Sequence, residues 1–265
     1  MTAVSNSIGT CTVPAHDGLE MVCDYAGEGD LRILFLHGWT CRRAYWRPQL
    51  EYFSRFGRIA APDLPGHGDS AAGGREKWSV AALGKDAAAC ARGLDGSRVI
   101  LVGHSMGGAV ALEAARLLED RALAVILADT FVLDYGGLDA ATQQQIAQSF
   151  ENDFAGAMTA LVEQTSTAAT PEPLKNRLVR EMSAADPDWA LPLWRDLLAW
   201  SPSAAFAELG IPIYAINGAL IPESARLRCA EFVTETVMPG AGHFLQMENP
   251  VAFNQALEAI LDQLR

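Results

Sequence analysis

The sequence predicts an α/β fold, in which a mainly parallel sheet carries helices on both faces and a helical cap is inserted. Short apolar runs without polar alternation, typical of strands buried on both faces, recur along the chain. Segments with helical periodicity separate them, and this alternation is typical of a parallel sheet. The chain has 265 residues, half of them hydrophobic and a fifth charged, which is enough to bury one large core.

The first predicted element is an antiparallel hairpin, because residues 10–13 and 19–25 flank the turn sequence His16-Asp17-Gly18. Five buried strands are predicted after it, at residues 33–36, 58–61, 99–102, 124–128 and 211–216. Helical patterns cover residues 45–53 and 80–94. A closing helix is indicated by the stripe Phe253, Leu257, Ile260, Leu261 and Leu264.

The strand at residues 99–102 ends in the letters GHSMG at residues 103–107, and a helical pattern continues directly. The glycines suit a turn so tight that side chains would collide, and such a turn exposes the Ser105 hydroxyl at the carboxyl end of the strand. The helix that begins there directs free N–H groups at anything bound beside the serine. This pattern predicts an activated nucleophile at Ser105.

The interval from residue 131 to 202 contains no predicted buried strand. Apolar residues repeat there every three to four positions, as in Ile146, Phe150, Phe154 and Met158. We therefore expect a helical cap over residues 131–202, inserted into a core of residues 1–130 and 203–265. It follows a strand next to the nucleophile, where α/β sheets bind ligands, so we expect a lid whose inner wall shapes the pocket.

A serine hydroxyl needs a base, and the usual base is a histidine held by a carboxylate. His243 lies in a glycine-containing loop just before the closing helix and is the best candidate among five histidines. His104 precedes the nucleophile and is expected to be a packing or hydrogen-bonding neighbour of the pocket. The strand at residues 33–36 ends in His37-Gly38-Trp39, a loop whose Trp39 N–H, with that of Met106, would form an oxyanion hole.

Four ordered motifs, at residues 36–39, 63–70, 103–108 and 242–244, together resemble the α/β-hydrolase fold family. The resemblance runs from about residue 30 to the end, apart from the insertion. It implies that Ser105 is the nucleophile, His243 the base, and Trp39 with Met106 the oxyanion donors. The scaffold supports many chemistries, so it does not fix the substrate.

The sequence departs from that family at the acid. Most members have an aspartate in the loop after the strand predicted at residues 211–216, and the loop at residues 217–223 has none. Glu223 ends that loop but is expected to begin a helix. Asp129 ends the strand at 124–128, a position that some relatives use, and we favour it over Glu223 because a strand end faces the site.

Composition excludes several classes of partner and cofactor. A net charge of −12 without clusters of lysine or arginine disfavours nucleic acid and anionic membranes. The five scattered cysteines contain no C-x-x-C pair, and the Asp/His turn at residues 63–70 has too few ligands, so neither disulfides nor a metal site is expected. No leader or membrane-spanning run is evident, so we expect a cytoplasmic protein of undetermined oligomeric state.

These patterns favour a serine hydrolase that cleaves carboxylic esters of small to medium apolar substrates through an acyl-enzyme, without a cofactor. The aromatic residues Phe150, Phe154, Trp189 and Trp194 of the insertion, with His104, are expected to line the substrate pocket. A carbon-carbon bond hydrolase and a cofactor-free oxygenase are alternatives on the same fold. A non-catalytic ligand receptor is a further alternative.

Overall fold

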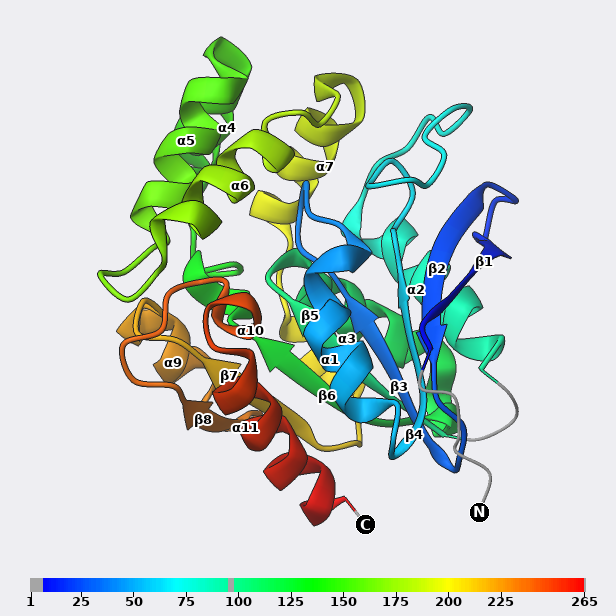
Figure 1. Cartoon of the computed structure of the whole chain (residues 1–265). Coiled ribbons are helices and arrows are strands. Elements are labelled where there is room, and N and C mark those ends of the chain that lie inside the picture. Colours follow the sequence, from blue (N-terminus) through cyan, green and yellow to red (C-terminus); the bar gives the residue numbers. More distant parts are fainter. Residues whose placement is uncertain (1–6, 95–97, 265) are drawn as a thin grey trace.

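The computed structural model describes residues 7–94 and 98–264, and an eight-stranded sheet lies at its centre (Figure 1). The sheet order is β1-β2-β4-β3-β5-β6-β7-β8. β1 and β2 form an antiparallel hairpin, β2 is antiparallel to β4, and the remaining neighbours are parallel. The strands are β1 (Gly9–Pro14), β2 (Glu20–Ala26), β3 (Leu31–Leu36), β4 (Gly57–Pro62), β5 (Val99–His104), β6 (Ala122–Ala128), β7 (Ile213–Asn217) and β8 (Thr234–Val237).

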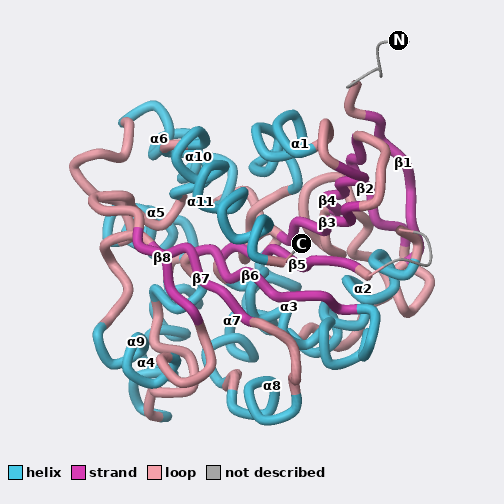
Figure 2. The backbone as a smooth tube through the Cα atoms, turned by 90° about the horizontal axis from the view of Figure 1, so that it is seen from below, coloured by secondary structure: helices cyan, strands magenta, loops and turns pink. Residues whose placement is uncertain are grey.

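Helices cover both faces of this sheet, as Figure 2 shows from below. One face packs against α1 (Arg47–Phe53) and α11 (Pro250–Gln263), the other against α2 (Val80–Arg92) and α3 (Met106–Leu118). Alternate residues of one strand enter different cores: Phe35 joins the α1 and α11 side, whereas Leu34 and Leu36 join the α2 and α3 side. The central strands therefore need apolar side chains on both faces, which explains their continuous apolar runs.

The predicted α/β fold, the hairpin and the five buried strands are confirmed. The helix expected at residues 45–53 begins with a 3-10 turn, Arg43–Trp46, which continues as α1. Strand β8 was not among the predicted strands. All four of its side chains are exposed, so this edge strand carries no apolar run that could reveal it.

The segment between β6 and β7 is helical, as its periodicity predicts. It begins with a 3-10 turn, Thr130–Val132, and continues with α4 (Ala140–Asn152), α5 (Phe154–Gln164), α6 (Glu172–Met182) and α7 (Pro187–Ala199). We call α4 to α7 the inserted helices. They lie together at one end of the sheet (Figure 1), and they contact the core at Trp39, in the loop after β3.

Three shorter helices complete the described chain: α8 (Ser203–Glu208), α9 (Glu223–Cys229) and α10 (Leu245–Glu248), besides a 3-10 turn at Glu119–Arg121. Within residues 7–94 and 98–264, no helix has the length and apolar character needed to cross a membrane.

Candidate active site

Ser105 occupies the turn between β5 and α3, with a strained backbone at φ 54° and ψ −125°. The turn requires glycine at both sides. A Cβ at Gly103 would clash with the Gly107 carbonyl, and a Cβ at Gly107 would clash with the Leu36 carbonyl. The Ser105 N–H donates to the Ala128 carbonyl at 3.0 Å, which fixes the turn to the end of β6.

Asp129 and His243 form a buried hydrogen-bonded pair beside this serine. Asp129 follows β6, is fully buried, and accepts a hydrogen bond from His243 Nδ1 at 2.8 Å through Oδ2. Its other oxygen, Oδ1, accepts from the Gly218 N–H at 2.6 Å. Because a carboxylate can only accept, the His243 proton is assigned to Nδ1, and Nε2 is left as an acceptor.

The loop that carries His243 is held at several points. The His243 N–H donates to the Thr165 carbonyl of the segment after α5 at 2.8 Å, and the His243 carbonyl accepts from His104 Nε2 at 2.9 Å. The neighbouring Gly242 N–H donates to Glu248 at 2.7 Å. These bonds hold the backbone of the loop, and Asp129 orients the imidazole itself.

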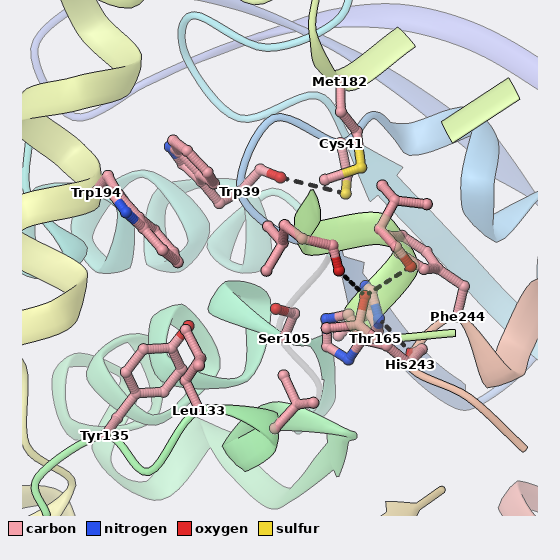
Figure 3. A pocket seen from close by; sticks show the side chains of 14 residues that line it. Trp39, Cys41, Ser105, Leu133, Tyr135, Thr165, Met182, Trp194, His243 and Phe244 are labelled. Carbon is pink, nitrogen blue, oxygen red and sulfur yellow. Dashed lines mark hydrogen bonds between the residues drawn. The ribbon is translucent and has the colours of Figure 1, made fainter. Parts of the chain in front are cut away.

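Ser105 and His243 line one cavity, as Figure 3 shows. Within the described chain, no hydrogen bond joins Ser105 Oγ to the imidazole in this conformation. Catalytic hydrogen bonds in ligand-free enzymes are often long and tighten only in the substrate complex. The geometry thus brings a serine, a histidine and an aspartate to one place.

Glu223, the other carboxylate that the sequence left open, lies elsewhere. It is the exposed first residue of α9, where it supplies the negative charge that a helix N-terminus favours. The hydrogen bonds of His243 do not involve it. Asp129 is the carboxylate that contacts the imidazole.

The loop after β3 passes close to the serine. A Cβ at Gly38 would lie 3.2 Å from the Ser105 Cβ, so the next residue, Trp39, begins beside Ser105. His37 fixes this loop: its Nδ1 donates to the Gly38 carbonyl and its Nε2 accepts from the Leu64 N–H, both at 2.9 Å. Burial lowers the pKa of His37 to about 4, so the ring stays neutral and can make both bonds.

Met106 is the first residue of α3, and N–H groups in the first turn of a helix have no intrahelical partner. The Trp39 N–H, in the loop after β3, also has no hydrogen-bond acceptor in the part of the chain that the structure describes. Both N–H groups are available for a ligand oxygen beside Ser105.

His104 is buried between Ser105 and the His243 loop. Its Nε2 donates to the His243 carbonyl, and its buried Nδ1 has no partner among the described residues. Burial and the neighbouring His243 hold the pKa of His104 well below its usual range. The ring therefore acts as a neutral donor to the loop.

The cavity at Ser105 is small, about 20 Å³, which is room for roughly one water molecule. Of the predicted pocket residues, His104 and Trp194 line it. Phe150 and Phe154 lie behind this lining and pack edge-to-face on Trp39, with ring centroids 5.1 and 6.0 Å away.

Trp189, the remaining predicted pocket residue, packs on His67 with ring centroids 4.3 Å apart, outside the cavity. The cavity also has lining residues that sequence reasoning missed. Among them are Cys41, Tyr135, Thr165 and Met182, which come from four separate segments. No motif joins these residues, and only Phe244, next to His243, could have been found by position.

Two polar clusters away from this site have structural partners. In the turn at residues 63–70, the buried Asp63 accepts from the Arg43 and Asp69 N–H groups at 2.6 and 2.9 Å. Asp86, which lies beside His16, is paired with the Arg75 guanidinium through both oxygens, at 2.7 and 3.0 Å. The cluster of His16, Asp17 and Asp86 therefore already has a positive partner, the Arg75 guanidinium, where a metal ion would otherwise supply the charge.

Comparison with known proteins places these observations in context. Residues 33–256 match the model of the alpha/beta hydrolase family. The chain is 27% identical over 257 residues to the dihydrolipoyllysine-residue acetyltransferase component of an acetoin cleaving system from Pseudomonas putida, covering 90% of this chain and 65% of that protein. It spans less than two thirds of the length of the curated relatives that it matches first.

Solved structures with the same fold carry different descriptions. A thermophilic esterase from Thermogutta terrifontis superimposes with a TM-score of 0.81 and 24% identity, covering 97% of this chain and 99% of that one. A bromoperoxidase from Bacillus anthracis gives a TM-score of 0.82 and 21% identity, covering 96% of this chain and 100% of that one. At these identities the likeness shows the fold alone.

Proposed function

The chain belongs to the alpha/beta hydrolase family, and from this premise we propose that it is a serine hydrolase that cleaves carboxylic esters of small to medium apolar substrates. One observation carries the proposal: His243, oriented by Asp129 at 2.8 Å, shares a buried apolar cavity with Ser105 at a strained strand-to-helix turn. A nucleophile, a base and an orienting acid are the three groups that acyl transfer needs.

In the proposed mechanism, His243 Nε2 takes the proton of Ser105 as Oγ attacks the ester carbonyl. The tetrahedral oxyanion accepts hydrogen bonds from the backbone N–H groups of Trp39 and Met106. The imidazolium then gives its proton to the leaving alcohol, which departs and leaves the acyl group on Ser105. Asp129 holds the imidazole in the required tautomer and stabilises its positive charge.

Deacylation repeats the same steps with water. His243 takes a proton from water, the resulting nucleophile attacks the acyl carbonyl, and the carboxylic acid leaves as Ser105 regains its proton. No cofactor takes part in this mechanism. The inserted helices α5 to α7, which contribute Val162, Met182 and Trp194 to the lining, are proposed to act as the lid of the pocket.

Ester hydrolysis also accords with the descriptions of several similar structures as esterases. A panel of p-nitrophenyl esters from acetate to palmitate, run beside a fluorophosphonate that labels active serines, tests the proposal. We expect turnover of the shorter esters and labelling at Ser105. Labelling without turnover of any ester would contradict the substrate class, and the absence of both would contradict the serine hydrolase itself.

A further inference from the structure

The cavity at Ser105 is too small for the substrates proposed above. Its volume is about 20 Å³, whereas small-molecule sites usually have roughly 300–1,000 Å³. Either the walls move or part of the ester stays outside. A hollow that adjoins the cavity is then the place from which a substrate can reach the serine and in which the rest of the ester can remain.

A larger hollow of about 550 Å³ lies next to this cavity. We call it the lateral groove, and it lies between Thr40 and Arg42 after β3, Gly66 to Gly68 after β4, and residues 180–186 at the end of α6. Cys41 lines both the groove and the cavity. The two spaces are therefore separated at that point by a single side chain.

Met182 completes this partition. Its side chain lines the cavity, whereas Glu181 and Ala184, close to it in the chain, line the groove. Figure 3 shows Met182 beside Cys41 at one edge of the cavity. Only 3% of Cys41 and 4% of Met182 is exposed, so both side chains are packed in the apolar core in this conformation.

The hollow lined by Phe131 and Ile221 shares no residue with the cavity, unlike the lateral groove. Of the other cavity residues, Tyr135 and Val162 are only 1% exposed, and Thr165 is joined by its carbonyl to the His243 loop. Moving those walls would disturb the core or the proposed base. Methionine, in contrast, has three rotatable bonds and fills irregular gaps, so Met182 can change rotamer without backbone movement.

The lateral groove differs from the cavity in chemistry. The cavity lining is mainly apolar, whereas the groove carries the cations Arg42 and Arg180 and the anions Glu181 and Asp186. The four formal charges cancel, so the groove offers polar partners of both signs and no net attraction for a charged ligand. An ester that spans both spaces would have an apolar end at Ser105 and a polar, uncharged end in the groove.

We infer that the lateral groove is the passage to Ser105 and the subsite for the polar part of the ester, with Cys41 and Met182 as its gate. This inference rests on the proposed serine hydrolase. It narrows the substrate class to esters that join a small apolar acyl group to an uncharged polar alcohol. The alcohol then leaves through the groove to solvent.

Two fluorophosphonate probes that differ in their tails test the passage, because labelling of Ser105 does not require ester turnover. One probe carries an ethyl group and the other a polyethylene glycol chain ending in biotin. Ala184→Trp fills the groove at an exposed position outside the cavity. We expect it to slow labelling by the long probe, relative to the ethyl probe, by about tenfold or more.

Ala160→Trp is the matched control, since Ala160 is an exposed alanine of α5 that lines neither space. Met182→Ala opens the gate and should speed labelling by the long probe, whereas Met182→Leu, which nearly conserves volume, should not. Equal probe ratios in Ala184→Trp and wild type would overturn the inference alone. Failure of both probes to label the wild type would overturn the proposed function, and the inference with it.

Discussion

Asp129 combines a left-handed backbone, φ 49° and ψ 39°, with a fully buried carboxylate whose two oxygens are both hydrogen-bonded. Aspartate and asparagine are the side chains that tolerate this backbone best, because they can bond to nearby groups. An amide at position 129 would therefore keep the shape of the site. It would lack the negative charge and the second acceptor.

This difference makes Asp129→Asn an informative variant. We expect it to lower kcat for ester hydrolysis by up to about 10⁴-fold, because the amide no longer fixes the His243 tautomer or stabilises the imidazolium. Glu223→Gln is the matched control and should keep most activity, since Glu223 is an exposed charge at a helix start. An inactive Glu223→Gln beside an active Asp129→Asn would reverse the assignment.

Ser105 can be tested in the same assay. Ser105→Ala should lower kcat by about 10³-fold or more, because only binding and oxyanion stabilisation would remain. The variant should fold, since it loses a single oxygen atom and gains no bulk at the turn. Near-normal turnover by a folded Ser105→Ala protein, checked by circular dichroism, would refute the nucleophile.

Between elements, an aromatic cluster joins the loop after β3 to the inserted helices. Trp39 stacks on Trp194 of α7 with ring centroids 4.2 Å apart, and its Nε1 donates to the Ala190 carbonyl of the same helix at 3.0 Å. Phe150 of α4 and Phe154 of α5 pack on the edge of this stack. The loop proposed to supply an oxyanion donor is thus held by three inserted helices.

Trp194→Ala should destabilise both the loop after β3 and the inserted helices that pack on it. We expect a loss of about 3–5 kcal/mol in unfolding free energy, measured by urea denaturation, and a lower kcat because the loop after β3 loses its support. Trp194→Phe keeps the stacked ring and removes a buried indole N–H that has no partner among the described residues, so it should cost less than about 1.5 kcal/mol. Equal stability of the two variants would mean that the stack does not join these elements.

At the scale of the whole molecule, the sequence predicted what depends on local pattern. The buried strands have continuous apolar runs, and the turn at Ser105 has glycines on both sides. Each of these local patterns is specific to the element that it forms. Which face of a helix lines the cavity depends on how distant segments pack together. The periodicity of apolar residues predicts the helix but not which of its residues face the cavity. Phe150, Phe154 and Trp189 were expected at the pocket for their aromatic character, yet Leu161, Val162 and Thr165 of the same segment line the cavity instead.

The choice of acid and the cavity lining likewise depend on contacts in space, which the local sequence pattern does not determine. Its place at the end of a strand favoured Asp129, but chain order could not decide between it and Glu223, because the decision depends on which carboxylate reaches His243 in space. Cys41 and Met182, which lie 141 positions apart in sequence, meet only through the docking of α6 on the loop after β3. Such a contact leaves no motif in either segment.

The buried histidines couple the stability of the whole fold to pH. Burial lowers the pKa of His37 from 6.5 to about 4 and that of His67 to about 3, and that of His104 lies well below its usual range. Below pH 6.5 the unfolded chain binds protons that the folded chain does not. The contribution of these neutral histidines to the unfolding free energy is therefore complete above pH 6.5 and falls as the pH decreases. For His37 the loss levels off below about pH 4.

For His37 alone, this linkage predicts a loss of about 2 kcal/mol in unfolding free energy between pH 7 and pH 5. Urea denaturation at pH 7, 6 and 5 measures it, and His37→Gln is the control because glutamine can accept from the Leu64 N–H without titrating. The net charge of −12 relaxes on acidification in both proteins, so its effect cancels in the comparison. The variant should show a shallower pH dependence by about 2 kcal/mol, and parallel curves would mean that folding does not shift the pKa of His37.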